Sequence, residues 1–118
     1  RCGWIDLVAL DFACMINGVT QVVMTKADVL DAFDELSVCT SYKVDGKEQR
    51  AVPYQMNKVD IDPQYKSFEG WKTDITRMKT KDELPQPMKE YISFINNYLG
   101  VDVSYISNGP EREQIIKA

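Results

Sequence analysis

The sequence contains no histidine. This absence excludes Ser-His-Asp and Cys-His catalysis by these residues and removes the commonest zinc and iron ligand. The three cysteines, Cys2, Cys14 and Cys39, are an odd number and form no Cys-x-x-Cys pair. We therefore expect no disulfide framework and a reducing, cytoplasmic compartment. Cys14 and Cys39 are predicted to be small hydrophobic core residues.

Long apolar runs and an excess of positive charge are also lacking. No apolar stretch approaches the roughly 18 residues that a membrane span needs, and no secretion signal pattern is present. The 14 Lys and Arg are outnumbered by 18 Asp and Glu, and the imbalance lies within residues 1–40. An acidic first third with a balanced remainder is not typical of a nucleic-acid groove or of a surface for anionic membranes. We predict neither kind of partner.

With 118 residues, of which 44% are hydrophobic, the chain has the size and composition of one globular domain. It begins at Arg1, without an initiator Met, directly before apolar residues. The segment 4–17 has helical spacing but is apolar nearly all round, so it needs neighbours on more than one side. These two features predict that the sequence is a portion of a longer protein.

Local signals predict alternating helices and strands. Asp6 is placed to cap a helix over 4–17 that Gly18 ends. Further along the chain, we expect a buried strand over 20–25, helical turns over 29–36, a strand over 37–44, a hairpin turn at Asp45-Gly46 and a return strand over 49–53. The fold class is therefore predicted to be α/β, with a mixed sheet, a β-hairpin and flanking helices.

The remainder divides into two predicted parts, so that we expect segments 1–53, 54–80 and 81–118. Residues 54–80 lose periodicity and predict a long surface loop. Its anchors are predicted to be the aromatic residues Tyr54, Tyr65, Phe68 and Trp71. Residues 80–83 form a capping-box pattern, and Pro85 and Pro87 suit a first helical turn, so we predict an amphipathic helix over 88–99. A strand over 101–107, a turn at Asn108-Gly109-Pro110 and a final strand over 114–117 are expected after it.

The most informative motif is Thr25-Lys26-Ala27-Asp28, which follows a predicted strand. Ligands in open α/β sheets bind outside the carboxyl ends of strands. A carboxylate can accept two hydrogen bonds from the ring N–H and the exocyclic amine of guanine, while a lysine stem two residues earlier lies along the base. The alternative is that Asp28, with Asp31, caps the following helical turn.

Ser107-Asn108-Gly109 follows another predicted strand. A hydroxyl and backbone N–H groups in such a turn can bind a purine oxygen or a ribose, and the alternative is a plain Asn-Gly turn. The remaining carboxylate groups lie on predicted solvated faces; these are Asp31, Asp34, Glu35, Asp82 and Glu83. No G-x-x-x-x-G-K-[ST] loop is present to bind phosphates, so the sequence holds at most half of a nucleotide site.

Several ordered blocks together resemble adenylosuccinate synthetase over essentially the whole chain. The blocks are Arg1–Asp6, Ile16-Asn17-Gly18, Thr25–Asp31, Val38–Tyr42, Glu69-Gly70-Trp71 and Ser107–Glu113. Enzymes of this family use GTP and Mg²⁺ to convert IMP and aspartate into adenylosuccinate in purine nucleotide synthesis. GTP phosphorylates the 6-oxygen of IMP, and the aspartate amine then displaces the phosphate.

The resemblance implies a role for particular residues. It places Lys26, Ala27 and Asp28 in the guanine-binding segment, and Ser107, Asn108 and Gly109 in a second segment that closes on the GTP base. Asn108 stands where many members carry a smaller or hydroxyl residue, a change that is harmless if only the backbone contacts GTP.

The resemblance also places Arg1 at the edge of the loop that binds the aspartate substrate. It implies that the chain is the C-terminal portion of a larger P-loop-like α/β enzyme. The phosphate loop, the catalytic residues, the Mg²⁺ site and most IMP contacts would then lie in a missing N-terminal region, so we expect the portion to be inactive alone. We expect the whole protein to be a homodimer.

Two other hypotheses remain open at this point. One is a self-contained, non-enzymatic interaction domain whose apolar first helix docks a partner protein. The other is a fragment of a switch-type GTPase, because those proteins also place a lysine–aspartate pair on guanine.

Overall fold

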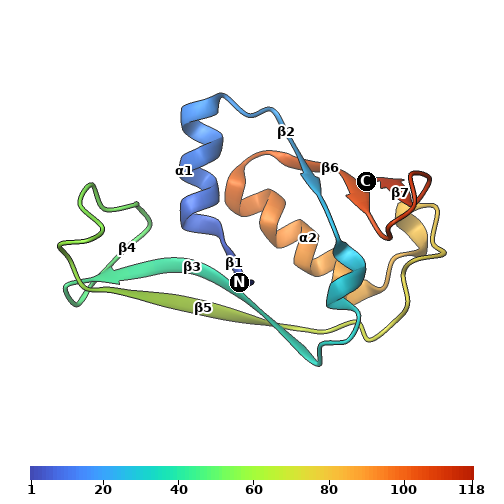
Figure 1. Ribbon diagram of the computed structural model, residues 1–118, viewed down its shortest axis with the longest axis horizontal. Coiled ribbons are helices and arrows are strands. Elements are labelled where there is room, and N and C mark those ends of the chain that lie inside the picture. The colour runs from blue at the N-terminus through green and yellow to red at the C-terminus, as the bar shows by residue number, and fades with distance from the viewer. The chain divides into compact units, whose positions relative to one another are not determined.

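The computed structural model describes all residues, Arg1–Ala118. The chain forms two compact units, each built from two separate stretches of sequence. Unit 1 consists of residues 1–19 and 37–67, and unit 2 of residues 20–36 and 68–118. The two helices and the strands are labelled in Figure 1. Mixed sheets, a hairpin and helices confirm the predicted α/β class.

Unit 1 contains a four-stranded mixed sheet and one helix. Its elements are β1 (Ile5–Asp6), α1 (Leu7–Asn17), β3 (Glu35–Val44), β4 (Lys47–Gln49) and β5 (Ile61–Glu69), where β3 and β5 extend by two residues each into unit 2. β1 pairs with β3 in parallel, β4 pairs with β3 in antiparallel orientation, and β5 also pairs with β3 (Figure 1). Val8, Cys39 and Tyr42 form the buried core of this unit.

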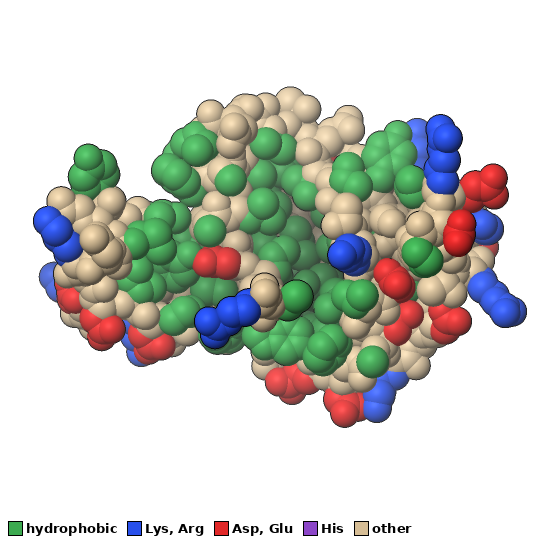
Figure 2. Space-filling view, viewed as in Figure 1, with side chains coloured by type: hydrophobic (Ala, Val, Ile, Leu, Met, Phe, Trp, Pro, Cys, Tyr) green, Lys and Arg blue, Asp and Glu red, His purple; other side chains and the backbone are tan.

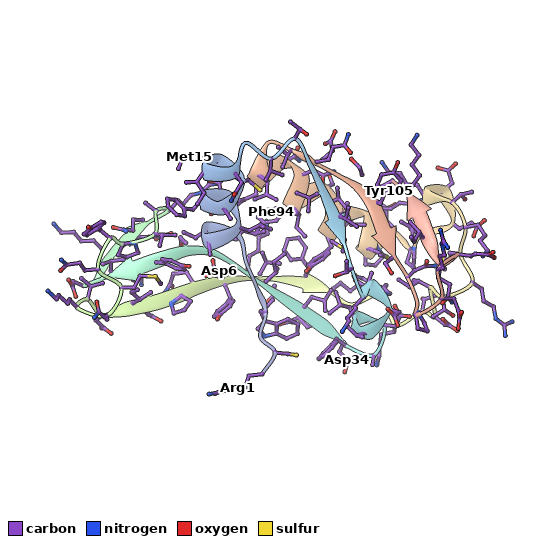
Figure 3. The ribbon with its side chains drawn as sticks, turned by 45° about the horizontal axis from the view of Figure 1, so that its top comes forward. Arg1, Asp6, Met15, Asp34, Phe94 and Tyr105 are labelled. Atoms are coloured by element: carbon purple, nitrogen blue, oxygen red, sulfur yellow. The ribbon has the colours of Figure 1, made fainter.

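The ends of α1 follow the local signals in the sequence. The Asp6 carboxylate accepts hydrogen bonds from the N–H groups of Val8 and Ala9 at 3.0 and 3.1 Å. Gly18 ends the helix with φ of 59°, a conformation in which a side chain is strained. Asp6, which is labelled in Figure 3, also accepts a hydrogen bond from the Tyr42 hydroxyl, and this bond links the start of the helix to β3.

The predicted hairpin turn is confirmed, and its return strand is shorter than expected. Asp45 and Gly46 both have positive φ, as a two-residue turn between paired Val44 and Lys47 requires. β4 ends at Gln49 instead of continuing to residue 53.

The predicted loop over 54–80 is wrong for its central part, because β5 occupies residues 61–69. Pro63 suppressed the strand signal, but β5 pairs only with β3 and therefore has a free edge that tolerates a proline. The predicted aromatic anchors divide accordingly. Trp71 is buried, whereas Tyr54 is 99% exposed and Tyr65 is 55% exposed.

Unit 2 contains a three-stranded sheet and the longer helix. Its elements are β2 (Gln21–Met24), the short 3₁₀ helices η1 (Ala27–Leu30) and η2 (Lys81–Glu83), α2 (Gln86–Leu99), β6 (Asp102–Ser107) and β7 (Ile115–Lys117). β6 is central, with β2 parallel on one side and β7 antiparallel on the other. One face of α2 is buried through Met88, Tyr91, Ile92, Ile95 and Leu99, and the helix contacts β6.

Three local predictions in unit 2 need correction. The helical turns expected over 29–36 are limited to η1, because the chain enters β3 at Glu35. The capping box at Thr80 makes no side-chain cap, and α2 begins after Pro85. β2 is not buried on both faces, since Val23 is 56% exposed.

No helix in the structure is both long enough and apolar enough to cross a membrane.

Burial raises the pKa of Tyr91 to about 12, because the phenolate would lose its hydration. An unfolded tyrosine has a pKa of about 10, so the unfolded state ionises first as pH rises. The contribution of protonated Tyr91 to the stability of the fold is complete below pH 10 and is lost as pH rises from about 10 to 12. Over that interval we expect about 2–3 kcal/mol to be lost from the free energy of unfolding in urea. In Tyr91→Phe the free energy of unfolding should change less between pH 10 and 12. An equally steep loss in this variant would contradict the role of Tyr91.

Candidate functional site

The carboxyl ends of β2 and β6 meet at one edge of the sheet in unit 2. The strands are parallel, and Met24 at the end of β2 is in register with Ile106 near the end of β6. Residues 25–28 and 107–109 leave the sheet from this edge, and η1 contacts β6. The structure thus brings together the two segments that the sequence singled out separately, at the position where α/β sheets bind ligands.

The first segment turns sharply at Lys26, which has φ of 54° and ψ of 39°. This left-handed conformation is uncommon for a residue other than glycine, and such conformations concentrate at functional sites. The Lys26 side chain is exposed and Ala27 is buried. Asp28 is half-buried, and its carboxylate makes no hydrogen bond or ion pair within the chain.

The alternative role of Asp28 as a helix cap is wrong. The residue before η1 is Lys26, and no side chain caps this short helix. Asp31 is not part of a cap box either, because its carboxylate accepts hydrogen bonds from the indole N–H of Trp71 at 2.6 Å and from the N–H of Ile75 at 3.1 Å. The Asp28 carboxylate therefore retains its full capacity to accept hydrogen bonds from a ligand.

The second segment is held by its own residues. The Ser107 hydroxyl donates to the Gly109 carbonyl at 3.3 Å, and the N–H of Asn108 donates to the Gln114 carbonyl at 3.0 Å. A Cβ at Gly109 would overlap the side-chain amide of Gln114, so that amide would have to move to admit a larger residue. Ser107 and Gly109 are half-buried, which leaves part of each accessible.

Asn108 is fully buried, and its side chain points into unit 2. Its Nδ2 donates to the carbonyls of Ile75 and Met78 at 2.6 and 3.0 Å. The side chain is therefore committed to the protein interior. It also leaves only main-chain atoms of Asn108 for any contact with a nucleotide.

The carboxylate groups predicted to be solvated behave differently from one another. Asp34 is exposed and forms an ion pair with Lys72, whereas Asp31 is half-buried and doubly hydrogen-bonded, so the prediction is wrong for Asp31. Glu83 accepts a hydrogen bond from the N–H of Lys79 at 2.9 Å. Sequence spacing gave no signal for Asp31, because its partners lie 40 and 44 residues away.

The structure contains no group of three His, Cys, Asp or Glu side chains that could hold a metal ion. Cys14 and Cys39 are buried and unpaired, which confirms the core role predicted for them. Burial, reinforced by the nearby Asp6 carboxylate, raises the pKa of the Cys39 thiol and so disfavours the thiolate form. Arg1 is exposed ahead of β1 (Figure 3).

Two parallel strands with open loops at their carboxyl edge define the class of protein, an α/β protein of the kind that binds ligands where its strands end. A model of the family described as adenylosuccinate synthetase matches residues 1–116. The chain belongs to the adenylosuccinate synthetase family.

Individual relatives agree with this assignment. The chain is 51% identical over 116 residues to adenylosuccinate synthetase of Parabacteroides distasonis and 47% identical over 117 residues to that of Salinibacter ruber. In each case 98% of this chain and 27% of the relative are covered, so the chain spans about a quarter of these relatives. The solved structure of fully ligated adenylosuccinate synthetase from Plasmodium falciparum matches with a TM-score of 0.93 and 33% identity, over 100% of this chain and 29% of that one.

The family assignment replaces the two alternative hypotheses, an independent interaction domain and a fragment of a switch-type GTPase.

The absence of a side chain at Gly70 allows the main chain to pass close to the loop that follows η1. The Gly70 N–H donates to the Asp34 carbonyl at 2.8 Å, and a Cβ at this position would overlap the main-chain oxygen of Phe33. We therefore expect Gly70→Ala to lower the free energy of unfolding by about 1–3 kcal/mol, since a main-chain oxygen cannot rotate away. Gly3→Ala is the control, because a Cβ at Gly3 meets nothing within 4 Å. Equal unfolding midpoints in urea for the two variants would contradict the close approach.

Proposed function

We propose that this chain is the C-terminal portion of an enzyme that makes adenylosuccinate from IMP and aspartate with GTP, and that it supplies the guanine-binding half of the GTP site. Membership of the family supports the activity. The observation that carries the guanine role is the half-buried Asp28 carboxylate, which has no partner in the chain and lies at the edge where β2 and β6 end.

Guanine presents two donors on one edge, the ring N–H and the exocyclic amine. Both oxygens of the Asp28 carboxylate accept these donors, and the negative charge strengthens each hydrogen bond. Adenine offers no such donor pair on that edge, so Asp28 selects against ATP. The exposed Lys26 stem lies along the face of the base, with its ammonium group in water.

The second segment closes on the base from β6. The Ser107 hydroxyl and the main chain of Asn108 and Gly109 supply the contacts, because the Asn108 side chain is bonded elsewhere. A main-chain contact at Asn108 would not depend on which side chain this position carries.

The remaining parts of the reaction belong to other residues of the protein. The chain has no histidine, no phosphate-binding loop and no group of side chains that fits a Mg²⁺ ion, so no catalytic residue and no metal ligand is assigned to it. Arg1 lies at the edge of the loop for the aspartate substrate. A homodimeric whole protein and a cytoplasmic location remain predictions.

The apolar surface of α1 supports the view that more protein covers this unit. Phe12, Met15 and Ile16 are 44%, 69% and 61% exposed, and hydrophobic side chains are visible on the face shown in Figure 2. A quarter-length match to the relatives is consistent with cover by the missing N-terminal region of the same protein.

Asp28→Asn in the full-length protein tests the guanine role. The amide keeps one acceptor and turns an N–H₂ group toward a guanine donor, so KM for GTP should rise. The ratio of kcat/KM for GTP to that for ITP, whose base lacks the exocyclic amine, should fall about 10–100-fold, since a charge-assisted hydrogen bond contributes about 1.5–3 kcal/mol. Asp34→Asn is the matched control, because Asp34 is exposed and contributes only a surface ion pair. A GTP/ITP ratio in Asp28→Asn equal to that of the control would refute the role.

The isolated 118-residue chain should bind GTP weakly or not at all, because the groups that bind the triphosphate are missing from it. Calorimetric titration with GTP, and with ATP for comparison, measures this directly. Micromolar affinity for GTP would show that the chain holds a complete nucleotide site.

A further inference from the structure

Residues 71–78, here termed the bridging segment, are hydrogen-bonded within unit 2 to residues in or close to both candidate guanine-binding segments. On the β2 side, the Asp31 carboxylate accepts one hydrogen bond from the Trp71 indole at 2.6 Å and one from the Ile75 N–H at 3.1 Å. The N–H of Asp31 donates to the carbonyl of Asp28 at 3.1 Å. Asp31 therefore connects the bridging segment directly to the main chain of Asp28.

On the β6 side, two side-chain amides bind the same segment. Asn108 donates to the carbonyls of Ile75 and Met78, and the Gln114 Nε2 donates to the carbonyl of Thr76 at 3.0 Å. The Gln114 Oε1 accepts from the N–H of Glu111 at 2.8 Å, so this side chain also holds the loop that follows β6.

The orientation of the Asn108 amide is fixed by its surroundings. Both of its neighbours are carbonyl oxygens, so Nδ2 must face them, and Oδ1 is left buried without a hydrogen-bond partner. Burial of an unsatisfied polar atom is unfavourable, because the atom loses its hydrogen bonds to water. The two hydrogen bonds that the amide donates to the carbonyls of Ile75 and Met78 offset the unfavourable burial of Oδ1.

The main chain of Ile75 is hydrogen-bonded to residues on both sides, Asp31 after β2 and Asn108 after β6. Its N–H donates to Asp31, its carbonyl accepts from Asn108, and the residue is fully buried. One continuous series of hydrogen bonds thus runs from the Asp28 carbonyl through Asp31 and Ile75 to Asn108. Asn108 lies between Ser107 and Gly109, the residues assigned to the second segment.

We propose that Asp31 and Asn108, together with Gln114, are positioning residues that set the spacing between the two guanine-binding segments through the bridging segment. This inference rests on the proposed guanine site. None of these side chains touches the nucleotide. Their effect is to hold Asp28 and the 107–109 turn at the separation that fits one purine, and displacements of about 1 Å in such sites cost up to 100-fold in rate.

Asn108→Ala in the full-length protein is the principal test, because it removes both donated hydrogen bonds and the unsatisfied oxygen. We expect KM for GTP to rise about tenfold or more and the GTP/ITP ratio of kcat/KM to fall. KM for IMP and kcat at saturating GTP should stay within about twofold. A general loss of stability would lower the active fraction, and hence kcat, without changing KM for GTP alone.

Two further variants keep the test decisive if Asn108→Ala folds poorly. Trp71→Phe removes the indole N–H donated to Asp31, together with part of the ring volume, and keeps a buried aromatic ring, so it should raise KM for GTP in the same direction. Asn96→Ala is the matched control. The Asn96 side chain accepts a hydrogen bond from the N–H of Val103 at 2.9 Å in the same unit and makes no hydrogen bond to the bridging segment, so its loss should leave KM for GTP unchanged.

The outcomes separate this inference from the guanine role of Asp28. If Asp28→Asn lowers the GTP/ITP ratio while Asn108→Ala and Trp71→Phe match Asn96→Ala, the positioning role is overturned and the guanine site stands. If Asp28→Asn leaves the ratio unchanged, both proposals fall, because the spacing then serves no contact with the base.

Discussion

The arrangement of the candidate site depends on the main chain of one buried residue, Ile75. Its N–H and its carbonyl are bonded to side chains from two different loops, Asp31 after β2 and Asn108 after β6. Buried main-chain groups must find partners, so the two loops cannot move apart without leaving polar atoms unsatisfied. This constraint holds the two loops together, as the proposed binding of a flat base would require.

The sheet of unit 2 determines where the two loops lie. Parallel pairing of β2 with β6 brings both loops to one edge, and the left-handed turn at Lys26 leaves Asp28 half-buried and unpartnered beside it. A carboxylate with free acceptor capacity next to an accessible main chain fits the donor-rich edge of guanine. Membership of the adenylosuccinate synthetase family supplies the reaction in which such a site would serve.

Some features of the fold could be predicted from the sequence, because they depend on interactions between residues that are close together in the chain. Asp6 and Gly18 mark the ends of α1, and Asp45-Gly46 marks the hairpin turn, because each signal acts within a few residues. The strand β5 was missed because an edge strand tolerates Pro63. The roles of Asp31 and Asn108 could not be predicted, since their partners lie at least 30 residues away and only the folded chain brings them together.

A structure of the full-length protein with GTP bound tests the central claim most directly. The account predicts both Asp28 carboxylate oxygens within about 3 Å of the guanine ring nitrogen and exocyclic amine, with Asp31 and Asn108 still bonded to Ile75. A base bound elsewhere, or a bound base with the Asp31–Ile75–Asn108 hydrogen bonds broken, would contradict it.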